Sequence, residues 1–463
     1  FPTRRSSDLD NKFIFSSEIK QLLFFYKNRI VNKKILLDYL IVGYQEHSNE
    51  TFFDNIYKLN QSHNLSYDLN QHTFTINQYY DILENRNTKN LNEKESINHY
   101  KQKLEHSIKL RLRSDVKVGT CLSGGLDSSS ISGIASNLYH KESEKSFSAF
   151  HAKSSDPISD ESRYAKDVAN HFKLDLKIID LNSDDFFNSL DEIFYSQEEP
   201  FLSPSIIMQY FVMKEVKKSK CKVLLDGQGG DETLLGYERY YPAFLLSLNF
   251  KDFIKEFKLA IKNSKLSFMQ LILFLAYFTH SKIRILRLKK KHVSIKTKYF
   301  NMISKDLIKK SSKKYRNIFN LQHHEIFFTQ LSHLLKYEDR NSMRNSVETR
   351  LPFIDFELLE FALSLKNKYK IQNGWTKYIL RKSMQGFLPD NIVWRKHKIG
   401  FEAPQKTWMN QYKEIIKAEI KDSEIIKEIY GNVDDIKLSN ESIQWRLFNI
   451  ARWEKIYNVK LKI

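Results

Sequence analysis

Hydrophobic residues at helical spacing begin at Ile97, directly after a stretch that has almost nothing to bury. Residues 84–96, "ENRNTKNLNEKES", are nearly all polar and are typical of a linker. The apolar stripe that follows would face a core from one side of a helix, and it comprises Ile97, Tyr100, Leu104, Ile108 and Leu112. The pattern therefore predicts a domain boundary just before Ile97.

Beyond this helix, strand and helix signals alternate along the chain. The strand-like runs are "VKVGTCL" (116–122), "SFSAF" (146–150), "LDLKIIDL" (174–181) and "CKVLLDG" (221–227), with helical periods between them. Such alternation predicts an α/β fold with a doubly wound parallel sheet over about residues 97–240, and ligands at the carboxyl ends of its strands. The remainder of this domain, to residue 463, is predicted to be mostly helical.

The part of the chain before the linker is predicted to be β-rich. Residues 10–83 contain the strand-like segments "KFIFSS" (12–17), "TFFDNIYKLN" (51–60) and "HTFTINQYY" (72–80), and one helical segment, "EIKQLLFFY" (18–26). Residues 1–9 start with Phe1 and show neither alternation nor a helical period. We interpret residues 1–9 as a truncated or artefactual start.

The composition indicates a globular protein and raises the question of an anionic partner. Hydrophobic residues make up 41% of the 463, and the formal net charge is +19. Two basic clusters, "RLKKKH" (287–292) and "IKKSSKKYR" (308–316), lie in a basic stretch from about 251 to 316. Lysine is nevertheless abundant along the whole chain, and a diffuse excess is typical of a solvated surface, so we do not expect a nucleic-acid partner.

The cysteines and the apolar stretches indicate in which cellular compartment we expect the protein. Cys121 and Cys221 are the only cysteines, and both lie in strand-like runs, which argues against a disulfide framework or a zinc site. We expect both to be buried small hydrophobes in a cytoplasmic protein. The longest apolar stretch, "LSFMQLILFLAYF" (266–278), is too short to span a bilayer, so no membrane association is expected.

Two glycine-rich loops follow predicted strands and carry candidate chemistry. In "CLSGGLDSSS" (121–130), a strand, Ser-Gly-Gly and a helix place backbone N–H groups and a helix N-terminus at one point, which favours an anionic group. No Gly-Lys-Ser/Thr follows, so this is not the common P-loop. Asp127 beside a polyphosphate requires a cation, and this requirement predicts Mg²⁺.

The second loop, "DGQGGDE" (226–232), supplies a partner for the first. Asp231 can complete a magnesium site with Asp127 if the two strand ends are neighbours. Each loop alone is compatible with a glycine-rich turn that ends in a capping acid. The two together, at the ends of parallel strands, favour a binding site.

Several ordered motifs resemble one enzyme family. "LSGGLDSS" (122–129) resembles the pyrophosphate loop of adenylating ATP pyrophosphatases. Over residues 97–410, four further motifs resemble in order the synthetase domain of glutamine-hydrolysing asparagine synthetases: "EEPFLSPS" (198–205), "GQGGDETLLGYERY" (227–240), "DRNSMRNSVETRLPFID" (339–355) and "RKHKIGF" (395–401). "FIFSSEIKQLL" (13–23) is similar to a late segment of that family's glutaminase. The resemblance implies an adenine nucleotide alpha hydrolase-like sheet and an Ntn-type glutaminase remnant at 10–83.

The resemblance also implies a reaction. In the family, ATP converts the side-chain carboxylate of aspartate to an acyl-adenylate, pyrophosphate leaves, and ammonia from glutamine gives asparagine and AMP. The implied ATP and pyrophosphate ligands are Leu122, Ser123, Gly124, Gly125, Asp127, Ser128, Ser129 and Gly227, with Asp127 and Asp231 on Mg²⁺. The implied partners are small molecules, and the oligomeric state, for which a homodimer is one candidate, stays open.

The resemblance assigns roles to charged residues outside the two loops as well. It implies that Lys398 lies near the α-phosphate. Glu348 and Arg350 match a family pair, for which an ion pair that braces the loop is at least as good an interpretation as catalysis. Asp160 and Glu161 match a family pair for which helix capping is the stronger interpretation.

Two departures from the family pattern change the expected reaction. Where the family has Ser-Gly-Glu-Gly-x-Asp-Glu, this chain has Asp226 and Gln228, so Gln228 stands at the position of a catalytic glutamate and cannot carry charge. An amidotransferase that acts on another carboxylate is therefore an alternative; a tRNA-modifying enzyme with the same loop and a non-catalytic binding module are others. Phe1 is also not the family's N-terminal nucleophilic cysteine, so we expect this chain to use ammonia and not glutamine.

Overall fold

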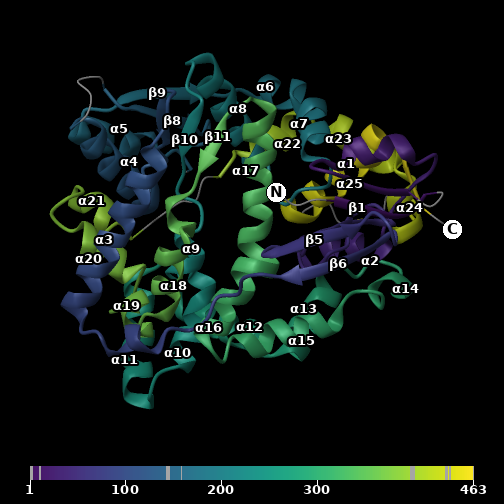
Figure 1. Cartoon of the computed structure of the whole chain (residues 1–463). Coiled ribbons are helices and arrows are strands. Elements are labelled where there is room, and N and C mark those ends of the chain that lie inside the picture. Colours follow the sequence, from purple (N-terminus) through teal and green to yellow (C-terminus); the bar gives the residue numbers. More distant parts are fainter. Residues whose placement is uncertain are drawn as a thin grey trace.

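A parallel sheet lies at the centre of the computed structural model, which describes residues 4–9, 12–141, 146–157, 159–396, 402–432, 436 and 440–461. Its five strands lie in the order β11-β10-β7-β8-β9 (Figure 1). They are β7 (Val118–Cys121), β8 (Ser148–Lys153), β9 (Asp175–Asp180), β10 (Val223–Leu225) and β11 (Glu348–Arg350). The first four confirm the predicted strands, whereas β11 was missed because three residues are too few to show a period.

The order of the strands reverses direction between β7 and β10. From β7 the chain moves outward to β8 and β9, and then returns to place β10 on the other side of β7. Such a switch point opens a crevice at the carboxyl ends of the two central strands. Both glycine-rich loops follow these two strands.

Helices cover both faces of this sheet, as a doubly wound fold requires (Figure 1). On one face lie α3 (Glu93–Leu112), α4 (Leu126–Tyr139) and α5 (Ser162–Phe172), and on the other lie α8 (Ser205–Lys218) and α17 (Gln330–Arg344). Successive residues of β10 alternate between the two layers, because Val223 and Leu225 belong to the core under α3 and α4 while Leu224 belongs to the core under α8. The predicted α/β class with a parallel sheet is confirmed.

The predicted linker is shorter in the structure than in the sequence analysis. α3 begins at Glu93, because Asn92 and Glu95 form a capping box in which each side chain accepts a hydrogen bond from the other residue's backbone N–H, at 3.0 and 2.8 Å. Residues 86–90 form a short 3₁₀ helix. The polar residues that suggested a linker therefore partly serve to start a helix.

The N-terminal part contains short strands and two short helices. β1 (Arg4–Leu9) pairs antiparallel with β2 (Lys12–Ser16) and β4 (Ile56–Lys58), and β5 (His63–Asp68) forms a hairpin with β6 (Thr73–Gln78). α1 (Ile19–Leu22) and α2 (Lys33–Leu37) lie between β2 and β4. β1 shows that residues 4–9 form a strand, and the interpretation of residues 1–9 as a truncated or artefactual start stays a prediction. Its sequence, "RRSSDL", has no apolar alternation, and the strand is defined by its pairing with β2 and β4.

Residues 19–56 share a core with the end of the chain instead of forming one of their own. Phe52 and Phe53 meet the ring of Trp453 edge-on, with centroid distances of 5.9 and 5.1 Å. Trp453 lies on α25 (Glu441–Tyr457), and its indole N–H donates to the carbonyl of Glu198, which ends α7 (Leu190–Gln197), at 2.9 Å. The β-rich segment is thereby fixed against the main domain.

The chain beyond residue 240 is mostly helical, as predicted. The helices that matter below are α11 (Phe250–Asn263), α12 (Phe268–Thr279), α13 (Ser281–Lys291), α15 (Lys305–Lys314), α20 (Tyr378–Met384) and α23 (Lys413–Asp422). Among the residues that the structure describes, no single helix combines the length and the apolar composition needed to cross a membrane. α11 and α12 reach these values only as a pair, and the chain bends by 118° between them.

The shared core makes Trp453 a test of how the N-terminal part is held. Trp453→Ala should lower the free energy of unfolding by about 3–5 kcal/mol, because it removes a fully buried indole and leaves a cavity against Phe52 and Phe53. Urea unfolding and limited proteolysis of the N-terminal part measure the effect. Phe24→Ala, at a ring that is 86% exposed, is the matched control and should change stability by less than about 0.5 kcal/mol. Equal effects of the two substitutions would contradict a shared core.

Candidate active site

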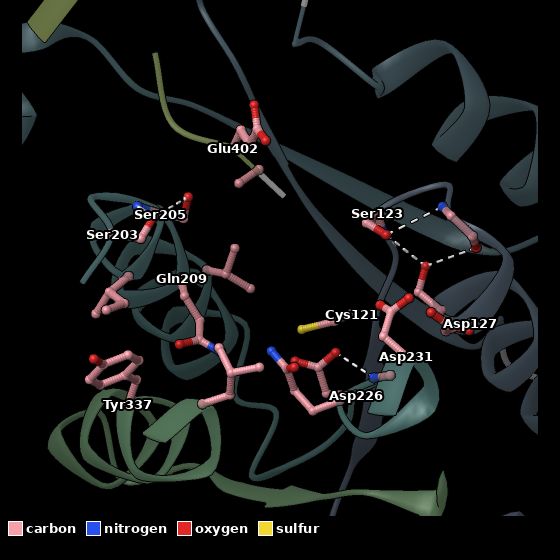
Figure 2. A pocket seen from close by; sticks show the side chains of 18 of the residues that line it. Cys121, Ser123, Asp127, Ser203, Ser205, Gln209, Asp226, Asp231, Tyr337 and Glu402 are labelled. Carbon is pink, nitrogen blue, oxygen red and sulfur yellow. Dashed lines mark hydrogen bonds between the residues drawn. The ribbon is translucent and has the colours of Figure 1, made fainter. Parts of the chain in front are cut away.

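A cavity of about 480 Å³ opens at the carboxyl ends of β7 and β10. The two glycine-rich loops form one side of it, and α8, α17 and the stretch 202–205 form the other (Figure 2). Because β7 and β10 pair directly, Asp127 and Asp231 come together as the sequence predicted. The predicted residues that line the cavity are Leu122, Ser123, Gly125, Asp127, Ser128, Gly227, Gln228 and Asp231, while Gly124 and Ser129 lie behind the loop surface.

The first loop is held rigidly by its own serines. The hydroxyls of Ser123 and Ser128 are 2.9 Å apart, the N–H of Ser123 donates to Ser128 Oγ at 3.1 Å, and the N–H of Gly125 donates to Ser123 Oγ at 3.3 Å. Gly124 has φ of 77°, and a Cβ there would lie 2.6 Å from the backbone nitrogen of Ala165. Only glycine fits at this turn, which brings the N-terminus of α4 to the cavity.

His151 braces the same loop from β8. Its Nδ1 lies 2.9 Å from the carbonyl oxygen of Leu122, and its Nε2 lies 3.0 Å from Ser162 Oγ. Burial lowers the pKa of His151 below its ordinary value, so the ring is neutral near pH 7 and donates from Nδ1, since a carbonyl only accepts. Asp160 accepts hydrogen bonds from the backbone N–H and the hydroxyl of Ser162 at 3.0 and 2.6 Å, in agreement with the helix-capping interpretation.

A buried lysine lies between the two aspartates. The ammonium of Lys377 contacts Asp127 Oδ2 and lies 2.5 Å from Asp231 Oδ1, and the residue is only 3% exposed. Lys377 precedes α20 with φ of 52°, in the left-handed region. A Cβ on Gly236 would lie 2.0 Å from Asp231 Oδ1 and 2.1 Å from Lys377 Cε, so a glycine at 236 makes room for the ion pair.

The donor set of this pair fits magnesium in part. Two carboxylates are what Mg²⁺ usually takes from a protein when phosphates supply further ligands. Among the described residues, no group of three or more His, Cys, Asp or Glu side chains is arranged to hold a metal. A metal at Asp127 and Asp231 would therefore take most of its ligands from phosphate and water, and it would share the two carboxylates with Lys377.

A second acid pair consists of Asp226, which lines the cavity, and Glu338, which is buried beside it. Asp226 follows β10 and accepts a hydrogen bond from the N–H of Gly227 at 2.5 Å, and Glu338 of α17 faces Asp226 from a position that is 1% exposed. Burial, reinforced by the charge of Asp226, raises the pKa of Glu338 well above its usual range. Burial also raises the pKa of Asp226, and the hydrogen bond from the N–H of Gly227 offsets part of this rise. Both carboxyl groups are therefore harder to ionise than ordinary acids, and the rise in pKa is the more pronounced for Glu338.

Cys121 differs from the expectation of a fully buried small hydrophobe. It is partly exposed at the end of β7, lines the cavity, and lies beside Asp226 (Figure 2). Burial and the nearby Asp226 carboxylate raise the pKa of the Cys121 thiol well above its ordinary value. The thiol is therefore a hydrogen-bond donor to the acid pair and not a reactive thiolate.

Glu348 and Lys398, both predicted to be catalytic, are placed differently from the loop residues. Glu348 begins β11, at the end of the strand away from the cavity, and its 60% exposed side chain accepts a hydrogen bond from Arg350 Nε at 2.7 Å. Arg350 also donates to the carbonyls of Arg111 and Arg113 at 2.8 and 2.7 Å, so the bracing interpretation fits this geometry. Lys398 lies outside the described residues.

The segment that leads to Lys398 is anchored at the cavity wall. Arg395 forms an ion pair with Glu161, and its guanidinium carbon lies 3.6 Å from the centre of the Tyr164 ring. Glu161 is one of the residues that line the cavity. The capping interpretation of Glu161 is replaced by this ion pair, because its side chain makes no hydrogen bond at the start of α5.

The part of the 339–355 motif that lies on α17 makes mainly structural contacts. Arg340 donates to the carbonyl of Ser17 and pairs with Glu198 Oε2, at 3.0 and 3.1 Å. Asn341 donates to the carbonyl of Ile206 at 2.8 Å and accepts from Gln197 Nε2 at 2.9 Å. These contacts tie α17 to the loop between α7 and α8, which forms the cavity wall opposite the first glycine-rich loop.

Comparison with known proteins agrees with this placement of motifs. The asparagine synthase family model matches residues 99–454. The chain is 30% identical over 340 residues to asparagine synthetase [glutamine-hydrolyzing] 1 of Bacillus subtilis (strain 168), covering 69% of this chain and 51% of that protein. It is 31% identical over 250 residues to the putative asparagine synthetase [glutamine-hydrolyzing] 2 of Methanocaldococcus jannaschii, covering 53% and 46%. The chain thus spans about half the length of these relatives.

A likeness to a solved structure adds nothing to this assignment. The U34-tRNA thiolase NcsA from Methanococcus maripaludis is 16% identical, with 47% of this chain and 80% of that chain covered, and its TM-score of 0.25 is too low to support an argument. The family model, by contrast, covers the whole sheet, both glycine-rich loops and α17. The chain belongs to the asparagine synthase family.

Proposed function

We propose that this chain is the synthetase part of an ATP-dependent amide-forming ligase, which adenylates the side-chain carboxylate of aspartate and transfers ammonia to give asparagine, AMP and pyrophosphate. The observation that carries this proposal is the meeting of the Ser-Gly-Gly loop, Asp127, Asp231 and Lys377 at one switch point. ATP and Mg²⁺ are the proposed cofactors. The membership of the chain in the asparagine synthase family supports the reaction class.

In the first step, an oxygen of the acceptor carboxylate attacks the α-phosphorus of ATP, and the bond to the β-phosphate oxygen breaks. Negative charge develops on the leaving pyrophosphate. The amides at the start of α4, the hydroxyls of Ser123 and Ser128 and the ammonium of Lys377 are fixed where they can stabilise that charge. Mg²⁺ held by Asp127 and Asp231 would supply further positive charge at the same place.

In the second step, ammonia attacks the acyl carbon, the bond to AMP breaks, and a proton leaves the nitrogen. Asp226 is a carboxyl group that lines the cavity and accepts a hydrogen bond from the N–H of Gly227. We assign the proton to Asp226, which then provides the carboxylate that the family pattern has two residues later, where this chain has Gln228. A base within the cavity fits this role because its carboxylate faces the space that substrates occupy.

The second candidate function is the same reaction with a different acceptor carboxylate. It is favoured because this chain has an acid at 226 and glutamine at 228, whereas the family pattern has serine and glutamate there. Asp226 and Gln228 both line the cavity, so moving the negative charge from 228 to 226 changes the shape and charge of the acceptor site. The chemistry of adenylation is the same for any carboxylate. The identity of the acceptor is therefore the part of the proposed function that depends most directly on the glutamine at 228.

Residues 10–83 are proposed to be the end of a glutaminase-type domain that supplies ammonia in the complete protein. The support is the resemblance of "FIFSSEIKQLL" to that domain and the printed name of the relatives, which are called glutamine-hydrolysing. Tyr39 of this segment donates to the carbonyl of Phe201 at 3.0 Å, directly beside the cavity wall.

The product of the reaction separates the two acceptors. With ATP, Mg²⁺ and ammonium, the chain should convert aspartate to asparagine and release one AMP for each asparagine, as measured by amino-acid analysis and nucleotide chromatography. Release of AMP with another carboxylate, and no asparagine from aspartate, would establish the second candidate. Gln228→Glu, with Asp226→Ser in the same chain, restores the family pattern and should then raise the activity with aspartate.

The ion pair around Lys377 predicts a large kinetic effect. Lys377→Met should lower the rate of AMP formation by about 10²–10³-fold, because it removes a buried cation from the developing charge. Gly236→Ala should also lower the rate of AMP formation, because its Cβ would collide with Asp231 and Lys377. The matched control is Lys218→Met, at a side chain that is 81% exposed, which should leave the rate unchanged. A normal rate in Lys377→Met, in a protein whose circular dichroism is unaltered, would contradict the assignment.

The acid pair predicts a dependence of stability on pH. The pKa of Glu338 is raised above 4.5 in the folded state, so between pH 4.5 and the folded pKa the folded chain holds a proton that the unfolded chain has lost. The contribution of Glu338 to stability is therefore fully present below pH 4.5 and is lost as the pH rises through the folded pKa. Glu338→Gln removes this dependence, so its advantage over the natural chain should grow as the pH rises. Each unit of pKa shift corresponds to about 1.4 kcal/mol in urea unfolding.

The same variant separates the roles of the two acids in catalysis. Glutamine at 338 can still donate a hydrogen bond to Asp226, so Glu338→Gln should keep most of the amide-forming activity at neutral pH. Asp226→Asn removes the carboxylate and should lose that activity while AMP formation persists. Glu348→Gln, outside the cavity, is the control for both measurements. A loss in Glu338→Gln equal to that in Asp226→Asn would show that the pair does not divide its roles in this way.

A further inference from the structure

The positive charge of this protein is concentrated in one helical segment. Residues 251–316 contain 19 Lys and Arg but only 3 Asp and Glu, so they account for +16 of the net charge of +19. This segment forms α11, α12, α13 and α15, which lie together along one edge of the molecule in Figure 1. The expectation of a diffuse lysine surface is therefore incorrect for this edge.

The same segment exposes a stripe of large apolar side chains. No Asp, Glu, Lys or Arg occurs between Leu266 and Thr279, yet Leu271 is the only residue of α12 that is fully buried. The residues that point outward recur one and four positions apart and are Phe268, Met269, Ile272 and Leu273, with exposures of 59, 60, 39 and 41%. An exposed stripe of this kind marks an interaction surface.

Basic and apolar side chains alternate on the outer faces of the helices beside α12. On α11 the exposed residues are Phe250, Lys251, Ile254, Lys255, Lys258 and Lys262, together with one acid, Asp252. On α13 they include Ile283, Leu286, Arg287, Lys289 and Lys290. Arg284 is not part of this surface, because it is buried and lies over the rings of Tyr44 and Tyr277.

We propose that the outer faces of α11, α12 and α13 dock on the surface of a membrane that carries anionic lipids. Apolar side chains that enter the acyl boundary, flanked by Lys and Arg at the level of the headgroups, are the two elements of an interfacial helix. The segment lies on the membrane and does not cross it, since α12 has 12 residues, a length of about 18 Å against a hydrocarbon core of about 30 Å. The proposal revises the expectation of no membrane association, which considered only spanning.

Charge decides between this occupant and a second copy of the chain. A dimer through this face would bring together two segments of +16 each, and the centre of a stable protein interface is depleted of charged residues. A nucleic acid would satisfy the lysines but would leave the aliphatic stripe of α12 in water. An anionic lipid surface satisfies both kinds of side chain.

The first experiment measures binding of the full-length protein to vesicles by co-sedimentation. Vesicles of phosphatidylcholine with phosphatidylglycerol should bind the protein, and the binding should weaken with salt, whereas pure phosphatidylcholine vesicles should bind it at least about tenfold more weakly. Met269→Glu with Leu273→Glu should abolish binding. The matched control, Ile178→Glu with Ile415→Glu, changes two exposed apolar residues on β9 and α23 and should bind like the natural chain.

If this surface binds nucleic acid or a second copy of the chain instead of a membrane, the experiments give a different result, and either result would overturn the proposal. Binding to tRNA that is lost in Lys289→Gln with Lys290→Gln but kept in Met269→Glu with Leu273→Glu would assign the surface to nucleic acid. A dimer that becomes a monomer in Met269→Glu with Leu273→Glu, without vesicle binding, would assign it to a second copy. AMP formation should be normal in all these variants, which separates this inference from the proposed reaction and shows that the variants fold.

Discussion

The ammonium of Lys377 between Asp127 and Asp231 is the interaction on which the site depends. Two carboxylates at the ends of neighbouring strands repel each other and repel a bound polyphosphate, and a cation between them removes both costs. Lys377 and Asp127 are 250 residues apart in the sequence, so the ion pair also ties the helical part of the chain to the central sheet. This contact also requires glycine at 236, because a Cβ there would collide with Asp231 and Lys377, and it is made with the backbone of Lys377 in the left-handed region.

Two parts of the site have different electrostatic environments. On the phosphate side, charges are permanent and opposite, because Lys377 is paired with carboxylates and the amides of α4 point to the same space. Deeper in the site, Asp226 and Glu338 are two acids that face each other, and burial raises the pKa of both. The first arrangement suits departure of pyrophosphate, and the second suits removal of a proton from nitrogen. Asp127, Asp231 and Asp226 line the same cavity of about 480 Å³, whereas Lys377 and Glu338 are buried beside them.

Local sequence patterns predicted the sheet and its loops well, because β7, β8 and β10 are short runs of mostly buried residues, the partly exposed edge strand β9 still carries Leu and Ile, and both loops are marked by glycines. The same patterns could not find Lys377 or Glu338. Lys377 is one of many lysines, and its role depends on a contact across the whole domain. Glu338 looks like an ordinary polar position on a helix, and only the tertiary structure shows that it is buried against Asp226. The shared core around Trp453 was missed for the same reason, since its contacts join the two ends of the chain.

The central claim is that the cavity activates a carboxylate by adenylation, and oxygen transfer tests it most directly. With an acceptor carboxylate labelled with ¹⁸O, ATP, Mg²⁺ and ammonium, mass spectrometry of the products follows the labelled oxygen. The account predicts that one labelled oxygen appears in the phosphate of AMP and none in pyrophosphate, because the carboxylate oxygen attacks the α-phosphorus and stays with AMP when ammonia displaces it. Label in inorganic phosphate, or an amide formed with no label in AMP, would contradict the account.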